Sequence, residues 1–114
     1  MRLEARKYLI DIQESAGLAA QFTAGKDYAQ YEQDPMLRMV TEWSFAILGD
    51  ACIQFARADA RQAARISSLP SMIAFCDALL HPRVEMDDRI VWDVIESKLP
   101  LFIREVGQLL EEPD

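Results

Sequence analysis

The sequence contains a single histidine, His81, and only two cysteines, Cys52 and Cys76, among its 114 residues. Because zinc sites are built mainly from clustered cysteine and histidine, this scarcity argues against zinc, and we expect neither a metal ion nor a cofactor. Both cysteines lie within apolar patterns of helical spacing. Reduced thiols in the core are therefore the default interpretation, and a disulfide is the alternative.

Long apolar runs, repeats, low-complexity tracts and linkers are also missing. No run approaches the roughly 18 residues of a membrane-spanning helix, and the first residues, MRLEARKYL, are charged rather than signal-like. With 51% hydrophobic and 27% charged residues, the composition is that of a globular protein. We therefore expect one domain, residues 1–114, in a soluble cytoplasmic protein that makes no membrane contact.

Basic residues are scarce, since 12 Lys and Arg face 19 Asp and Glu, for a net charge of −7. This balance argues against broad nonspecific binding of nucleic acid, although a local field can oppose the global charge at a small RNA site. Arg57, Arg61 and Arg65 recur every four residues and would share one side of a continuous helix. They form either a solvated face with ion pairs, for example to Asp59, or a strip that contacts phosphates.

The first half of the chain predicts two long helices. Residues 2–24 carry small and apolar side chains at three- and four-residue steps, and Gly25 is a plausible stop. After a connection, Asp34 and Pro35 predict the start of a helix that runs to about Ala58. Apolar residues cover nearly its whole circumference, which predicts a central helix that is buried on all sides and also suited to a dimer interface.

Gly49 and Asp50 interrupt this central helix. Glycine in a helix interior costs about 1 kcal/mol relative to alanine, and it often permits close approach by another backbone. Asp50 is surrounded by apolar residues in the sequence, so it either binds a partner group or belongs to a functional site. Both interpretations remain open.

A short helix is predicted between Pro70 and Pro82, with His81 at its C-terminal end. Proline suits the first turn of a helix, and Pro82 disfavours a helical conformation at His81. Apolar residues recur at helical spacing along this helix, so one face of it should point toward a core. These residues are Met72, Phe75, Cys76 and Leu79. His81 therefore lies at the rim of a packed element, where it is either an ordinary surface side chain or a functional one.

The last predicted helix begins near Asp87, a plausible cap, and follows an apolar stripe to the C-terminus. The stripe consists of Val91, Ile95, Leu99, Phe102, Val106 and Leu109. Pro100 should kink this helix rather than end it, because the stripe resumes in phase. Nothing shows the two-residue alternation of strands, so we predict an all-α fold, an antiparallel four-helix bundle with additional short helical segments.

Several segments of the chain occur in the same order as similar segments of one known protein family. They are MRLEARKYLIDI, FTAGKDYAQY, DPMLRMVTEWSFAILGDA, IAFCDALLH, MDDRIVWDVI and LPLFIREVGQLL. Over nearly its whole length the chain resembles the HepT-like branch of the HEPN superfamily, the toxin partners of nucleotidyltransferase antitoxins in prokaryotes. The resemblance implies a helical bundle that forms a homodimer, with a composite cleft between the subunits. In active members of the family that cleft is a metal-independent endoribonuclease.

The motif of the active family members is degenerate in this chain. The resemblance places Cys76 at the motif's arginine, Asp77 at its asparagine, His81 at its histidine and Arg83 at its tyrosine, and Gly49-Asp50 at a Gly-Glu pair. RNA cleavage by the 2′-hydroxyl needs a base, an acid and a cation or donors at the phosphate. Cys76 cannot replace arginine in the last role, whereas Arg83 either reaches into the same cleft or stays solvated.

Three hypotheses follow. The chain is a toxin-type subunit with impaired ribonuclease activity, or a non-catalytic HEPN module that binds a nucleotidyltransferase, RNA or a paralogue, or a helical oligomerisation protein related only by ancestry. The missing arginine favours impaired or absent catalysis within the family role. In the family, the antitoxin transfers nucleotides to the tyrosine of the toxin's motif. This chain has Arg83 at that position, so it offers the antitoxin no hydroxyl to modify.

Overall fold

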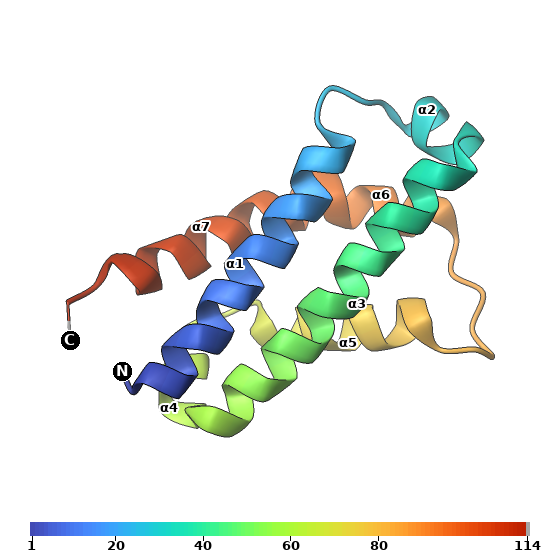
Figure 1. Ribbon diagram of the computed structural model, residues 1–114. Helices are drawn as coiled ribbons and strands as arrows, with labels where there is room; N and C mark the ends of the chain where they lie inside the picture. Colours follow the sequence, from blue (N-terminus) through green and yellow to red (C-terminus); the bar gives the residue numbers. More distant parts are fainter. Residues whose placement is uncertain (114) are drawn as a thin grey trace.

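The computed structural model describes residues 1–113 and consists of helices joined by short connections (Figure 1). The helices are α1 (Leu3–Thr23), α2 (Tyr28–Gln33), α3 (Pro35–Ala58), α4 (Ala60–Ala63), α5 (Leu69–Leu80), α6 (Asp88–Asp93), the π-helical turn η1 (Val94–Lys98) and α7 (Leu99–Glu111). No strand occurs in this described part of the chain, and the predicted all-α fold is confirmed. Within these residues no helix has the length and apolar character needed to cross a membrane.

Helices α1 and α3 lie antiparallel and form the most extensive contact in the molecule (Figure 1). The buried face of α1 includes the small side chains of Ala5, Ala16 and Ala19. The chain leaves α1 through Gly25, whose φ of +73° is the left-handed conformation that favours glycine. The predicted first helix and its stop are therefore confirmed.

Helix α3 begins as predicted, because the Asp34 side chain accepts a hydrogen bond from the Leu37 amide and Pro35 occupies the first turn. The prediction that α3 is buried on all sides is wrong for the single chain. Trp43 is 57% exposed, and it lies in an exposed apolar stripe on one side of the helix. This α3 stripe consists of Met36, Met39, Trp43 and Ile47. Apolar character all round a helix predicts burial only if every side has a neighbour in the same chain.

The three arginines at positions 57, 61 and 65 do not lie on one continuous helix, because α3 ends at Ala58. Asp59 adopts a non-helical conformation, and its carboxylate accepts a hydrogen bond from the Gln62 amide at the start of α4. Of the three arginines, Arg65 forms an ion pair, with Glu112 at 2.5 Å, rather than with Asp59.

Helix α5 begins at a fixed point on α7. The hydroxyls of Ser67 and Ser68 donate to the two carboxylate oxygens of Glu105, at 2.8 and 2.9 Å, and the Ser67 amide donates to the same carboxylate. Partial desolvation raises the pKa of Glu105, but these hydrogen bonds more than offset it and leave the pKa below its usual value. The carboxylate thus lies at the N-terminal end of α5, where the helix dipole favours a negative charge.

The C-terminal part confirms the cap expected at Asp87, and the helix continues through Pro100 rather than ending there, as predicted. The Asp87 carboxylate accepts from the Arg89 amide, and the whole predicted apolar stripe is buried. The irregularity lies just before Pro100, where the Leu99 amide bonds to the carbonyl of Val94, five residues earlier. A π-helical turn of this kind inserts one extra residue into a helix, and the stripe is buried on both sides of it.

Candidate functional site

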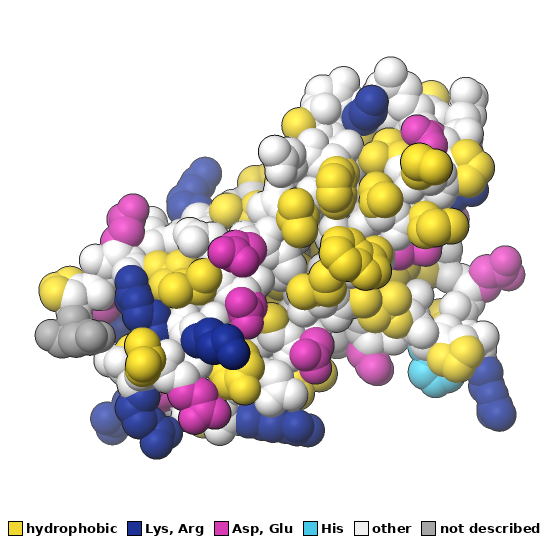
Figure 2. All heavy atoms as spheres, viewed as in Figure 1, with side chains coloured by type: hydrophobic (Ala, Val, Ile, Leu, Met, Phe, Trp, Pro, Cys, Tyr) yellow, Lys and Arg dark blue, Asp and Glu magenta, His cyan; other side chains and the backbone are white. Residues whose placement is uncertain are grey.

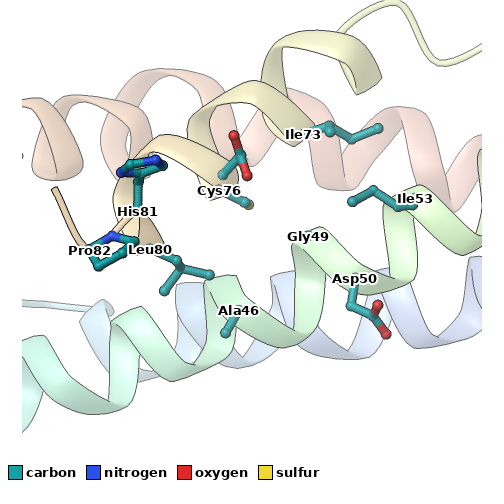
Figure 3. Close-up of a pocket in the computed structure, with 10 residues that line it drawn as sticks. Ala46, Gly49, Asp50, Ile53, Ile73, Cys76, Leu80, His81 and Pro82 are labelled. Atoms are coloured by element: carbon teal, nitrogen blue, oxygen red, sulfur yellow. The ribbon is translucent and has the colours of Figure 1, made fainter. Parts of the chain in front are cut away.

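A pocket of about 310 Å³ lies between α3 and α5, and it contains most of the predicted site residues (Figure 3). Its lining is formed by Ala46, Gly49, Asp50, Ile53, Ile73, Cys76, Asp77, Leu80, His81 and Pro82. The fold therefore brings together Asp50, Cys76, Asp77 and His81, which are as much as 31 positions apart in the sequence. It does not bring the side chain of Arg83 into the lining.

Helix α5 packs tightly on α3 because position 49 is glycine. A Cβ atom added at Gly49 would lie 2.8 Å from the Cβ atom of Cys76, closer than real Cβ contacts. The predicted close approach at Gly49 is confirmed, and the neighbouring atom is the Cβ of Cys76. At this point between the two helices there is no room for a larger residue at position 49.

Cys76 is only 2% exposed, and it is a free thiol like the buried Cys52. Burial raises the pKa of Cys76 to about 12. At neutral pH the Cys76 side chain, which the resemblance places at the motif's arginine, is therefore an uncharged thiol. It can offer a phosphate only a weak hydrogen bond.

His81 is the C-cap of α5 and has the extended conformation that Pro82 was predicted to impose. Its ring is exposed at the end of the helix, and Nδ1 accepts a hydrogen bond of 3.1 Å from the Arg83 backbone amide. Because Nδ1 is the acceptor, the neutral ring carries its proton on Nε2. In this conformation Nε2 is a hydrogen-bond donor, and the basic nitrogen Nδ1 is engaged by the Arg83 amide. His81 must therefore release that bond before it can take up a proton and pass it on.

The two carboxylates of the pocket do not pair with His81. Asp50 is exposed, and Figure 3 shows its side chain pointing away from α5, at the far side of the pocket from the imidazole. Asp77 is also exposed on α5. Within the described residues, neither carboxylate has a hydrogen-bond or ion-pair partner.

The described lining of the pocket contains no lysine or arginine. Its acidic side chains are Asp50 and Asp77. Arg83 is exposed and contacts His81 through its backbone amide rather than its guanidinium group. No group of three or more His, Cys, Asp and Glu among the described residues could hold a metal ion. The pocket is thus mildly acidic, with one imidazole at its rim.

The sequence interpretation did not identify the apolar wall of the pocket, formed by Ala46, Ile53, Ile73 and Leu80. A signal was available on α3, where Ala46, Gly49 and Ile53 follow one another at three- and four-residue steps. The same spacing applies to the core-facing residues of the helix, so periodicity alone could not separate the two sides.

The comparisons with known proteins agree with this architecture. The family model "Ribonuclease HepT-like" matches residues 12–109. The chain is also similar to "Putative RNase MJ1380" of Methanocaldococcus jannaschii, with 25% identity over 105 residues that cover 90% of this chain and 94% of that protein. No solved structure is significantly similar. Since the family model covers most of the chain, including α3, α5 and His81, this protein belongs to the HepT-like ribonuclease family.

Proposed function

We propose that this chain is the toxin-type subunit of a prokaryotic toxin–antitoxin pair and acts in the cytoplasm, with an impaired metal-independent endoribonuclease activity. One observation carries the proposal of impairment. His81 is present at the pocket, but the position of the motif's arginine holds the buried, neutral thiol of Cys76, and no described lysine or arginine lines the pocket.

The charges of the pocket explain why cleavage would be slow. In the transition state of RNA cleavage, negative charge grows on the phosphate and must be stabilised by cations or hydrogen-bond donors. Here the phosphate would meet the carboxylates of Asp50 and Asp77, which repel it. His81 could still protonate a leaving oxygen from its imidazolium form, which becomes neutral imidazole in the step, since proton transfer by a positioned side chain contributes about 10²- to 10⁴-fold.

The activity is tested by incubating the purified protein and its His81→Ala variant with single-stranded RNA in the presence of a metal chelator. We expect slow cleavage by the parent and a loss of about 10²-fold or more in His81→Ala, because the pocket contains no second imidazole. Gel electrophoresis of end-labelled RNA measures both rates. Cleavage that survives in His81→Ala, or that stops with the chelator, would contradict the assignment.

The lack of a described lysine or arginine in the pocket lining favours a second candidate, a non-catalytic HEPN module that binds a nucleotidyltransferase antitoxin, RNA or a paralogue. Parent protein with no cleavage at all, but with retained binding to one of these partners, would select this candidate. Arg83 is relevant to both functions, because it has no hydroxyl to which an antitoxin could transfer a nucleotide. We therefore propose that any antitoxin acts by binding rather than by modifying position 83.

We further propose a homodimer that uses the α3 stripe (Met36, Met39, Trp43 and Ile47). The exposed apolar side chains gather on this face in Figure 2, and the stripe ends next to Asp50 at the pocket. Large apolar side chains that lie together on a surface are typical of protein interfaces. A two-fold axis near Ile47 would bring the pockets of two copies close to each other.

Trp43→Glu is expected to shift this dimer to monomer, because it places a charge in the centre of the proposed interface. Loss of a buried tryptophan at an interface typically costs 2 kcal/mol or more, which is a change of roughly thirtyfold in the dissociation constant. Sedimentation velocity measures the change. Leu101→Glu is the control, because Leu101 is similarly exposed, at 51%, but lies on α7. Equal sedimentation of Trp43→Glu and the parent would disprove the interface.

A further inference from the structure

The positive charge of this acidic chain is concentrated in two short segments. Residues 1–7 and 57–65 contain six of the twelve Lys and Arg residues but only two of the nineteen Asp and Glu residues. Their formal charge is +4, while the remainder of the chain carries −11. We call the surface formed by these two segments the basic end. Its six cations are Arg2, Arg6, Lys7, Arg57, Arg61 and Arg65.

The fold places the two segments side by side. The beginning of α1 lies next to α4 in Figure 1, and Figure 2 shows dark blue side chains gathered around that part of the surface. The guanidinium group of Arg2 donates to the carbonyl of Ala58 at 2.9 Å, and that of Arg6 donates to the carbonyl of Leu110 at 3.4 Å. Both contacts hold an arginine against a helix C-terminus without neutralising its charge, and they leave further N–H donors unused.

Most of the remaining charge at the basic end is also available. Within the described residues, Lys7, Arg57 and Arg61 have no hydrogen-bond or ion-pair partner for their side chains. The nearby carboxylate of Asp59 is occupied by the Gln62 amide. Arg65 is the exception, because it pairs with Glu112. The ion pairs that the sequence suggested for Arg57 and Arg61 are therefore not formed.

We infer that the basic end binds the phosphate backbone of single-stranded RNA. Five of its six cations are arginines, whose planar forks of donors match phosphate oxygens. An acidic protein partner fits less well, because protein interfaces usually have an apolar core. Leu3 is the only large, strongly exposed apolar residue of the basic end in the described structure, whereas the other such residues lie elsewhere.

The basic end is placed so that RNA bound there can reach the pocket. This part of the inference rests on the proposed function. Helix α5 leads from the segment after α4 to His81, and its 12 residues span about 18 Å. RNA held at the basic end can therefore extend along α5 to the pocket. The attraction at one end offsets the repulsion that Asp50 and Asp77 exert at the other.

Fluorescence anisotropy with a labelled 20-nucleotide oligouridine tests the inference in the intact protein, in a chelator and over a series of salt concentrations. The double variant Arg57→Gln and Arg61→Gln is expected to bind about fivefold or more weakly near 0.1 M salt. The slope of log affinity against log salt should fall by about 1.4, since each phosphate contact on a single strand contributes about 0.7. The control is Lys26→Gln with Lys98→Gln, which removes the same charge from two exposed side chains outside the basic end.

Unchanged affinity and slope in the arginine variant, an equal loss in the lysine control, or no RNA binding by the parent would each overturn the inference. Unchanged RNA binding combined with altered sedimentation would instead assign the basic end to contacts between protein copies, and would also overturn it. The readout is independent of cleavage. A parent that binds RNA through Arg57 and Arg61 but cannot cut it leaves the inference standing and removes only the proposed activity.

Discussion

The double variant Cys76→Arg with Asp77→Asn is expected to cleave RNA about 10³- to 10⁵-fold faster than the parent in the absence of metal. An arginine inserted at a reacting phosphate contributes this much in other phosphoryl-transfer enzymes, which corresponds to about 4–7 kcal/mol of barrier. Position 76 suits the purpose because Cys76 is buried yet lines the pocket, so a longer side chain has a path toward the rim. Asp77→Asn removes one of the two repelling carboxylates. The initial rate of cleavage of a labelled RNA measures the gain.

Cys76→Ala with Asp77→Asn is the matched control, because it removes the same carboxylate without adding a cation. A thermal unfolding curve for each variant shows whether the larger side chain is tolerated beside Gly49. If Cys76→Arg does not fold, Asp77→Arg offers a cation to the same pocket from an exposed position. A folded arginine variant that cleaves no faster than the alanine control would show that the missing arginine is not what limits the activity.

Gly49→Ala is expected to destabilise the protein by about 1–3 kcal/mol, although alanine normally improves a helix interior. The added Cβ would lie 2.8 Å from the Cβ of Cys76, so the backbone of α3 or α5 must shift. Gly17→Ala is the matched control, since Gly17 is inside α1 with nothing within 4 Å of the added atom. That variant should gain about 0.5–1 kcal/mol. Chemical denaturation followed by circular dichroism measures both changes in the free energy of unfolding.

A second pair of substitutions isolates the contact. Cys76→Ala keeps the Cβ atom and should not relieve the clash in Gly49→Ala, whereas Cys76→Gly removes that atom and should recover part of the lost stability. A double-mutant cycle over positions 49 and 76 gives the coupling free energy directly. No coupling would mean that the distance between α3 and α5 is not set by this contact.

The helix boundaries were predictable because they depend on local chemistry. Asp34 with Pro35, Gly25 and Asp87 act within one turn of their own positions, so the sequence contains all the information that these caps require. The end of α3 at Ala58 was also predicted, but the short helix α4 after it was not. Asp59 lies between alanines and arginines that would also suit a continuous helix, and the non-helical conformation of one residue leaves no periodic signal.

The sequence interpretation named the polar residues of the pocket but not its geometry, and it also named Arg83, which does not line the pocket. Cys76, Asp77 and His81 follow one another on α5 and at its end, and Asp50 was singled out by its apolar neighbours in α3 as well as by the resemblance. The bond from the Arg83 amide to Nδ1 of His81 depends on the path of the chain after Pro82, which no helical period describes. The exposure of Trp43 likewise depends on which neighbours the single chain supplies, and hydrophobicity alone does not reveal this.

Because of the π-helical turn η1, the packing of α7 depends more on the number of residues in Val94–Lys98 than on which residues occupy its exposed positions. Each residue of an α-helix turns the chain by about 100°, so deleting one residue of Val94–Lys98 would either remove the wide turn or rotate all of α7 about its axis. In the second case Phe102 and Val106 would swing out of the core, and Glu105 would lose the serine hydroxyls that it holds at the start of α5. A one-codon deletion in this stretch would thus loosen the helix that carries His81, whereas many substitutions at its exposed positions would leave that helix in place.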